Sequence, residues 1–415
     1  MSDENIVSEP RPIDPDRNFR PDRLIHEITL RNILSFGPDT PPLKLGNLNV
    51  LIGPNGSGKS NLIEAIGLLK AAPKDLSEPV KDGGGVNDWL WKGAQRPTAS
   101  IEVVLHFPNG KPHKSSRMSL RHRIAFTEHA RRFEVVDESI ENTEAFLNAS
   151  KDDVYFYYRY QGGHPVLNTV VEGARKLKRE TIKPDQSVLP QYVDPERYPE
   201  LGYLNSVYER IGIYRDWTFG RYTPPRLTQK TDLAAAHLSS TAENLAHVLN
   251  YYRSKIKTPL IEALRDIYDD ADDFNVQFVA GLTQLFMEEG DFSIPATRLS
   301  DGTLRYLCLL VILLDPDPPP LICIDEPELG LHPDIIPTLA RLMRSASQRT
   351  QLIVTTHSTT LVDAMTETPE CVIVCGKEAG ASTMYRLPAD EMQRWMKNYS
   401  LGKLWRIGEL AGNRW

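Results

Sequence analysis

Residues 49–60 read Asn-Val-Leu-Ile-Gly-Pro-Asn-Gly-Ser-Gly-Lys-Ser. They contain the pattern G-x-x-x-x-G-K-[ST] of a phosphate-binding loop, whose fixed positions are Gly53, Gly58, Lys59 and Ser60. The apolar run 48–52 before the loop predicts a short buried strand of a parallel sheet. After the loop, apolar residues recur at helical spacing until Pro73, which predicts a helix. Strand, glycine-rich loop and helix therefore follow one another in the order that a nucleotide site needs.

The residue types of this loop suit a bound polyphosphate. Glycines let the backbone N–H groups point at the phosphates, and the helix that begins near Lys59 adds the positive end of its dipole. Lys59 is expected to reach the β- and γ-phosphates, and the Ser60 hydroxyl to ligate Mg²⁺. The predicted nucleotide contacts come from Gly53, Pro54, Asn55, Gly56, Ser57, Gly58, Lys59, Ser60 and Asn61.

The composition narrows the class of protein. Of 415 residues, 40% are hydrophobic and 25% charged, as in an ordinary soluble globular protein. The formal net charge of −7 gives no overall sign of nucleic-acid binding, so a DNA contact would need a local basic patch. The N-terminus is acidic and proline-rich, unlike a signal peptide, and the longest apolar run, 306–314, is shorter than the ~20 residues that cross a bilayer. We therefore expect a cytoplasmic protein without a membrane partner.

The four cysteines lie in apolar segments and are expected to be reduced. Cys371 and Cys375 are predicted to face the same side of one strand. Two buried thiols explain them better than a metal site does.

Four regions are expected along the chain. Residues 1–22 hold four prolines among charges and are interpreted as a flexible lead-in. Residues 23–110 form an N-terminal lobe with the phosphate-binding loop. Residues 111–290 form an insertion, first an antiparallel β subdomain and then a mixed helical region. Residues 291–415 form a C-terminal lobe that ends with a helix from about Asp390 and a tryptophan-rich tail.

Within the insertion, arginines and histidines gather between residues 114 and 132. They are compatible with a basic face for DNA, although a solvated strand face is the favoured interpretation. Farther on, Ser240–Glu243 fits a capping box before a helix, and Thr258-Pro259 is predicted to open a second helix.

Acidic residues after a strand in the second half supply the expected catalytic groups. The apolar segment 321–324 predicts a strand, and Asp325 at its end is placed to hold Mg²⁺ through its water shell. Glu326 can polarise the attacking water. His357 follows the next apolar strand and is expected to contact the γ-phosphate. The expected catalytic residues are Lys59, Glu326 and His357.

Four motifs occur together in the order found in ABC-type ATPase heads: Gly53–Ser60, Leu299–Thr303, Ile324–Pro333 and Thr356–Ser358. More narrowly, the chain resembles the RecF/SMC-like ATPases, which are related to the OLD-family heads of DNA repair and phage defence. The resemblance spans roughly residues 24–413 and is weak over 110–235. It implies an α/β P-loop NTPase fold, with an antiparallel β subdomain and a mixed helical insertion between the Walker A and signature motifs.

The resemblance also implies roles for further residues. Ser300 and Gly302 would be the signature motif, which caps the γ-phosphate of an ATP bound to a second copy of the chain. Asp301 and Thr303 depart from the commoner glycine and glutamine at their positions. A glutamine that senses Mg²⁺ is expected before the helix near Leu201. Gln191 is the first choice and Gln186 the second, so the expected metal ligands are Ser60, Asp325 and Gln191.

The function that this resemblance implies is an ATPase whose two copies close head to tail around ATP. It would act on double-stranded DNA, or on a partner nuclease or toxin, in DNA repair or anti-phage defence. One alternative is a regulatory scaffold that binds ATP, scarcely hydrolyses it and controls another protein. A transporter ATPase is the other alternative, and residues 328–333 together with the lack of a recognisable membrane-coupling segment argue against it.

Overall fold

The computed structural model describes residues 23–410, except 96, 108–118, 144–153, 162, 170–172, 177–181 and 388–398. The predicted lead-in 1–22 and the start of the helix predicted from about Asp390 lie outside the described residues.

A six-stranded sheet carries the functional site. Its strands follow the order β10-β15-β16-β3-β17-β18, and all neighbours are parallel except β17 and β18. Their bounds are β10 (Gly212–Tyr214), β15 (Leu321–Asp325), β16 (Gln351–Thr355), β3 (Leu48–Ile52), β17 (Val372–Glu378) and β18 (Ala381–Arg386). Because parallel strands end at the same edge of a sheet, the segments that follow β3, β15 and β16 meet there. These are the segments with the predicted phosphate-binding loop, acidic pair and histidine.

Side chains alternate between the two faces of the central sheet, and each face supports its own hydrophobic core. On β3, Val50 and Ile52 belong to one core and Leu51 to the other. On β15, Ile322 belongs to the first core and Cys323 to the second. Both faces are covered, and this explains why every residue of β3 is buried and why β15 is apolar from Leu321 to Ile324.

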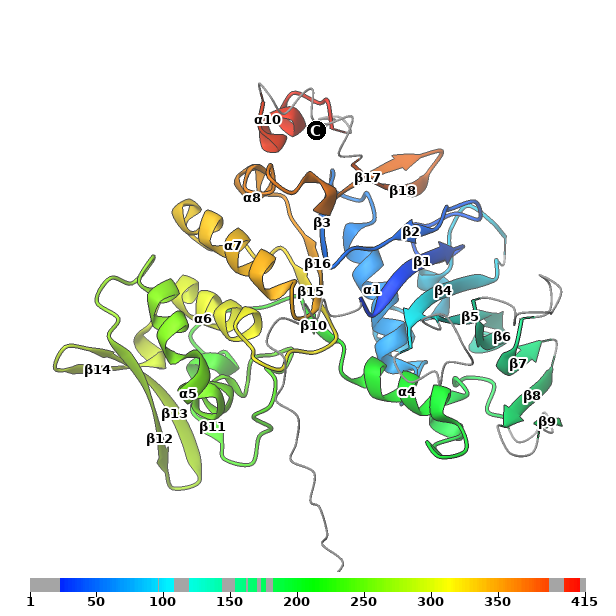
Figure 1. The fold of residues 1–415 in the computed structure, drawn as a ribbon, viewed down its shortest axis with the longest axis horizontal. Helices are drawn as coiled ribbons and strands as arrows, with labels where there is room; N and C mark the ends of the chain where they lie inside the picture. The colour runs from blue at the N-terminus through cyan, green and yellow to red at the C-terminus, as the bar shows by residue number, and fades with distance from the viewer. Residues whose placement is uncertain are drawn as a thin grey trace, which may run out of the picture.

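Helices cover one face, while helices and a second sheet cover the other (Figure 1). The core with Val50 includes residues of α5 (Leu245–Leu264), α6 (Asp301–Leu313), α7 (Ile336–Ala346), α8 (Thr359–Asp363) and α10 (Leu401–Arg406). The core with Leu51 includes residues of α1 (Lys59–Ala71), α2 (Glu78–Asp82), α3 (Val86–Trp89) and α4 (Pro199–Glu209).

The second sheet has eight antiparallel strands in the order β2-β1-β4-β5-β6-β7-β8-β9. Their bounds are β2 (Leu43–Lys44), β1 (Ile25–Arg31), β4 (Ala99–His106), β5 (Ser119–His129), β6 (Arg132–Asn142), β7 (Phe156–Gln161), β8 (His164–Thr169) and β9 (Gly173–Lys176). The predicted insertion 111–290 does not make this sheet alone, because β5–β9 extend strands of the N-terminal lobe. Its β10 also joins the central sheet, so both sheets cross the predicted boundary.

The prediction of a separate helix opened by Thr258-Pro259 is wrong, because α5 continues through Pro259. Tyr252, Ile256 and Leu260 stay buried at helical spacing on both sides of the proline. Pro259 and Lys255, whose carbonyl loses its donor, lie on the exposed face, where water can replace the missing hydrogen bond. Burial of the apolar stripe therefore outweighs the local cost of the proline.

The predicted capping box at Ser240–Glu243 is also absent, because the N-cap of α5 is Asn244. The Asn244 amide instead fixes the preceding loop. It donates to the carbonyl oxygens of Ala234 and His237 and accepts from the N–H of Ser239.

A small antiparallel sheet packs beside α5 (Figure 1). It contains β11 (Gln229–Lys230), β12 (Asp273–Val279), β13 (Leu282–Glu289) and β14 (Phe292–Pro295). Four large apolar side chains on its strands are exposed, namely Phe278, Val279, Leu282 and Phe292.

All four cysteines are buried free thiols, which includes the two buried thiols predicted at Cys371 and Cys375. The expectation that Cys371 and Cys375 share one side of a strand is wrong. Cys371 precedes β17 and joins the core of Val50, whereas Cys375 joins the core of Leu51.

Candidate functional site

The phosphate-binding loop runs from the end of β3 to the start of α1 and packs tightly against β17 and β18. At Gly53, φ is 149° and a Cβ would lie 2.2 Å from the carbonyl oxygen of Cys375. At Gly58, φ is 95° and a Cβ would lie 2.3 Å from the Oγ of Ser382. Neither position has room for a side chain, so this backbone path requires both glycines.

The loop residues predicted to contact the nucleotide differ in their exposure and in their hydrogen bonds. Asn55 and Gly56 are exposed at the tip of the loop. Ser57 is buried, and among the described residues its Oγ has no hydrogen-bond partner. Asn61 is directed elsewhere, since its amide donates to the Oγ of Ser35 at 2.8 Å.

Lys59 lies inside the loop and is 5% exposed. Its Nζ donates to the carbonyl oxygens of Gly53 at 2.9 Å and Pro54 at 3.2 Å. Burial lowers the pKa of Lys59, while Glu326 and other nearby acidic groups oppose that shift. A tight glycine loop, an internal ammonium group and an unpartnered hydroxyl fit a bound polyphosphate.

Ser60, in the first turn of α1, lies close to Asp325 at the end of β15. The Ser60 Oγ lies 3.4 Å from each carboxylate oxygen of Asp325. Asp325 also accepts a hydrogen bond from the Oγ of Thr355, its neighbour on β16. Hydroxyl and carboxylate oxygens are ligands of the kind Mg²⁺ prefers, so these residues fit a magnesium ion. They would hold the ion, and its charge would offset that of the phosphates.

Glu326 and His357 face each other at the ends of β15 and β16, with 3.4 Å between Glu326 Oε1 and His357 Nε2. Burial lowers the pKa of His357, and the Lys59 charge lowers it further. His357 is therefore neutral at pH 7. Glu326 has a φ of 47°, a left-handed conformation that costs a residue with a Cβ about 1–2 kcal/mol. Its neighbours must hold it in that conformation.

Glu328 is a structural residue of the site that the sequence argument missed. Its Oε1 accepts hydrogen bonds from Thr356 Oγ1 at 2.5 Å and from the N–H groups of His357 at 2.9 Å and Ser358 at 3.1 Å. The carboxylate therefore fixes the turn that carries His357. The available signal was a third acid after β15 and a Thr-His-Ser turn after the adjacent strand.

The predicted signature residues lie on a separate surface at the start of α6. Ser300 is the N-cap of α6, and its Oγ accepts from the Thr303 N–H at 3.0 Å. Gly302 lies so close to the next segment that a Cβ would be 3.0 Å from the Gly330 carbonyl oxygen. A hollow of about 540 Å³ opens here, lined by Ile267, Ser300, Gly302, Thr303, Gly330, Leu331, His332, Pro333 and Ile335. None of these residues belongs to the phosphate-binding loop.

Arg226 explains the unusual Asp301. Its guanidinium is buried, forms an ion pair with Asp301 and donates to the carbonyl oxygens of Ala296, Thr297 and Leu299. The insertion thus braces the backbone that leads into Ser300. Nothing in the spacing of the sequence motifs indicated this arginine.

Gln191, the predicted Mg²⁺ sensor, is engaged elsewhere. Its Oε1 accepts from the N–H of Lys183, and its Nε2 donates to the carbonyl oxygen of Ser187. Both hydrogen-bonding groups of the amide are therefore used by the backbone of its own segment. The structure does not bring Gln191 into contact with Ser60 or Asp325.

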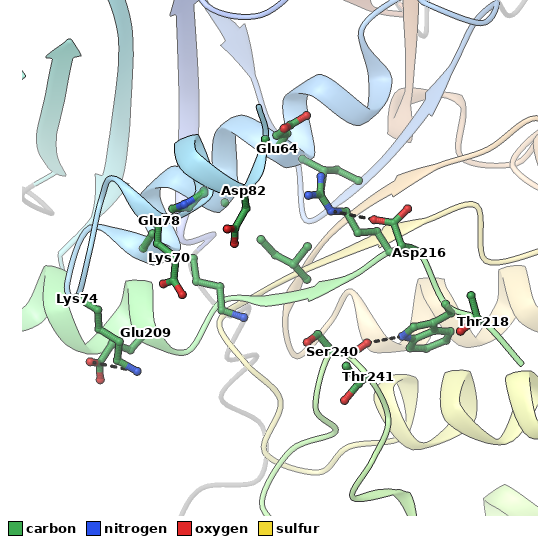
Figure 2. Close-up of a pocket in the computed structure, with 18 of the residues that line it drawn as sticks. Glu64, Lys70, Lys74, Glu78, Asp82, Glu209, Asp216, Thr218, Ser240 and Thr241 are labelled. Carbon is green, nitrogen blue, oxygen red and sulfur yellow. Dashed lines mark hydrogen bonds and ion pairs between the residues drawn. The ribbon is translucent and has the colours of Figure 1, made fainter. Parts of the chain in front are cut away.

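A cavity of about 730 Å³ begins one turn beyond Ser60 (Figure 2). It lies between α1 and α2 on one side and the segment after β10 on the other. Its lining includes Glu64, Asp82 and Asp216, which Figure 2 labels. Trp217 lines it and is fixed by a 2.7 Å hydrogen bond from its Nε1 to the Ser240 carbonyl oxygen. This cavity adjoins the loop without including it.

The basic residues of β5 are neutralised by the strands beside them. Arg121 lies 3.5 Å from Glu102 and 3.2 Å from Glu141, and Arg123 is paired with Asp137. The part of the basic stretch before residue 119 lies outside the described residues. On the described strand, these ion pairs agree with the favoured interpretation, a solvated strand face.

Residues 48–363 match a family described as "AAA domain, putative AbiEii toxin, Type IV TA system". The chain belongs to this AAA_21 family. The matched span begins at β3 and includes the loop, the signature residues, both acids and His357. Membership of this P-loop ATPase family supports ATP binding.

Similarity to SMC proteins gives the fold. The chain is 38% identical over 90 residues to the chromosome partition protein Smc of Desulfitobacterium hafniense (strain Y51), a match that covers 20% of this chain and only 7% of that protein. Among solved structures, it resembles an Smc head bound to the C-winged helix domain of ScpA, with 16% identity, 89% of this chain and 99% of the other covered, and a TM-score of 0.53. It also resembles the Smc head with an extended coiled coil from Pyrococcus furiosus, bound to the C-terminal domain of ScpA. The identity is 14%, the match covers 90% of this chain and 98% of the other, and the TM-score is 0.54.

The fold is therefore a mixed α/β fold that resembles an SMC head, in agreement with the predicted α/β class. No helix in the described part of the chain is both long and apolar enough to span a membrane.

Proposed function

We propose that the protein is an ATP-hydrolysing switch whose two copies close head to tail around ATP. The observation that carries this proposal is the separation of the Ser300 hollow from the Lys59 loop on a single chain. The Lys59 loop suits the phosphates of a bound nucleotide, and the Ser300 hollow suits contact with that nucleotide from a second copy. With two-fold symmetry, the loop of each copy would face the hollow of the other and form two equivalent sites.

The Ser300 surface suits a phosphate that another copy holds. Ser300 caps α6, a helix of 13 residues, so the N-terminus of α6 presents backbone N–H groups and a positive dipole. Ser300 itself is exposed, and Gly302 leaves the approach narrow but open. An anion delivered by a partner copy would meet these groups at the rim of the hollow.

Hydrolysis would then depend on the residues at the ends of β15 and β16. Glu326, whose carboxylate lies beside His357, would polarise the attacking water as general base. Neutral His357 can donate a hydrogen bond from one ring nitrogen to the γ-phosphate without adding charge. Lys59 would offset the charge of the phosphates, while Ser60 and Asp325 would hold Mg²⁺.

For the target of the switch, the described surface favours a partner effector protein over double-stranded DNA. Arg121 and Arg123 are occupied by ion pairs, which weakens the case for a basic DNA face on β5. Phe292 and Val279 are 70% and 66% exposed on the small sheet, and exposed apolar clusters of this kind mark protein-binding surfaces. The family description names an AbiEii toxin and a Type IV TA system, which supports a role in a system of that kind.

The test uses Glu326→Gln, which removes the general base but keeps the shape of the side chain. Light scattering should show that this variant accumulates a dimer in ATP and Mg²⁺, and that the additional change Lys59→Ala prevents it. A Glu326→Gln protein that stays monomeric at saturating ATP would contradict the proposed site, which is shared between two copies. An ATPase rate that rises with added duplex DNA and falls with salt would favour DNA as the target. An ATPase rate near zero in the wild type would favour the regulatory scaffold.

A further inference from the structure

We propose that Arg305 is the positioning residue for Glu326 and that it couples engagement of the signature surface to hydrolysis. This inference rests on the proposed function, in which Ser300 meets the ATP of a second copy. Arg305 and Ser300 lie at the same end of α6, on which the cap and the guanidinium are fixed in one rigid element. A force on the start of α6 would therefore reach the end of β15 through this side chain.

Glu326 needs support because its φ is 47°. Its N–H is held by β16, through the Thr355 carbonyl at 3.2 Å and the Thr355 Oγ1 at 3.1 Å. Its carbonyl accepts from Arg305 Nη2 at 2.9 Å and from the Leu329 N–H at 3.2 Å. Of these three partners, only Arg305 belongs to the helix that carries the signature surface. It is the direct link between that helix and the catalytic residue.

A second link is available through Glu328. Arg305 Nε and Glu328 Oε2 are both buried, and neither has a hydrogen-bond partner among the described residues. Burial lowers the pKa of Arg305, and Glu328 is the strongest of the charges that oppose this shift, as expected for a neighbouring carboxylate. The other oxygen of Glu328 already holds the turn of His357. A small movement of α6 would let Arg305 Nε donate to Glu328 Oε2, which would tie the helix to both catalytic residues.

Two aromatic rings restrict where the Arg305 guanidinium can go. Its central carbon lies 6.0 Å from the ring centroid of Trp217 and 5.8 Å from that of Phe219. Trp217 is itself anchored to the Ser240 carbonyl. The planar guanidinium carries its donors in a fixed fork that suits both Glu326 and Glu328, and the compact ammonium of a lysine does not reproduce this geometry.

The experiment compares Arg305→Lys and Arg305→Ala with Arg349→Ala. Arg349 is a matched control, since it donates to the Leu313 carbonyl at the other end of α6, at 2.7 Å, and has no contact with β15 in this structure. A hydrogen bond from a charged donor contributes about 1.5–3 kcal/mol, so both Arg305 variants should lose roughly 10- to 100-fold in kcat. KM for ATP should change by less than about twofold, because the phosphate-binding loop is untouched. Arg349→Ala should keep kcat within about twofold.

Two further measurements separate positioning from general structural damage. Guanidinium ion, at concentrations below those that unfold the protein, should restore part of the kcat of Arg305→Ala, and methylammonium should not. Arg305→Ala combined with Glu326→Gln should still form the ATP-dependent dimer in light scattering. Unchanged kcat in Arg305→Lys, or a loss of ATP binding in Arg305→Ala, would overturn the inference. A monomeric Glu326→Gln protein rejects the composite dimer instead, and the kcat of the Arg305 variants still tests whether Arg305 positions Glu326.

Discussion

The phosphate-binding loop and the signature surface are the two halves of the proposed site, and they are built in opposite ways. The loop packs closely against β17 and β18 at Gly53 and Gly58, and the Lys59 side chain is satisfied by carbonyl oxygens of the same loop. The signature surface is exposed, and its supports come from distant parts of the chain. Arg226 braces the backbone before Ser300, and Gly330 closes against Gly302.

Because of this difference, a substitution can affect ATP binding without affecting the closure of two copies around ATP, or the reverse. A stretch of about a dozen residues contains nearly everything that shapes the loop. The signature surface depends on the insertion and on the segment after β15, so any displacement of those elements is transmitted to Ser300. Substitutions in the loop should therefore abolish binding, whereas substitutions around Ser300 should spare binding and prevent closure.

The largest effect is expected from Lys59→Ala. It removes a buried ammonium whose hydrogen bonds would pass to the phosphates, and charge-assisted hydrogen bonds contribute about 1.5–3 kcal/mol each. Kd for ATP should rise at least about 100-fold in calorimetry. Lys74→Ala is the control, because Lys74 lies just beyond the end of α1 in an exposed ion pair with Glu209, 3.8 Å away. Retention of tight ATP binding by Lys59→Ala would remove the basis of the nucleotide site.

The next effect is expected from Ser300→Arg, which fills the hollow and removes the cap of α6. ATP should still bind, with Kd within about twofold, because the loop lies elsewhere. ATP-dependent dimers should disappear, and kcat should fall more than about tenfold. Ser300→Ala removes the cap alone, at a cost of about 1 kcal/mol of stability, and so separates loss of the cap from filling of the hollow. A Ser300→Arg protein that dimerises normally in ATP places the interface elsewhere.

Much of the arrangement of the candidate site could be predicted because its determinants are local. The loop pattern fixed Gly53, Gly58 and Lys59, and parallel strands bring the residues that follow them to one edge. Asp325, Glu326 and His357 therefore met where the strand order required.

The remaining features depend on contacts that local patterns do not encode. Pro259 was interpreted as a helix start, but the buried stripe of α5 keeps the helix continuous. Arg226 lies in a segment without a recognisable motif, and Arg305 lies two residues beyond the signature motif. Only the fold brings them to Ser300 and Glu326. Gln191 was chosen by its position before α4, whereas its amide is used by its own segment.

A smaller effect is expected from Arg226→Met, which removes the brace but leaves Ser300 in place. The backbone before α6 loses its donors, so the signature surface should become less well ordered, and kcat should fall about tenfold. Kd for ATP should stay within about twofold. Arg253→Met is a matched control, because Arg253 bridges Asp273 and the Phe274 carbonyl on the small sheet in the same manner. Equal losses of kcat in the two variants would show that Arg226 acts through overall stability alone.

The smallest effect is expected from the titration of His357, which lies beside Glu326 at the end of β16. Its folded-state pKa is lowered below 6.5 by burial and by Lys59, so the unfolded chain binds a proton more readily than the folded one. The contribution of neutral His357 to stability is therefore fully present above pH 6.5, the pKa in the unfolded chain. It is lost as the pH falls from there through the lower pKa of the folded protein. His357→Gln should remove this dependence, so between pH 7.5 and 5.5 the wild type should lose on the order of 1 °C more in Tm than the variant. Equal losses of Tm would mean that His357 is not held in the neutral form by its site.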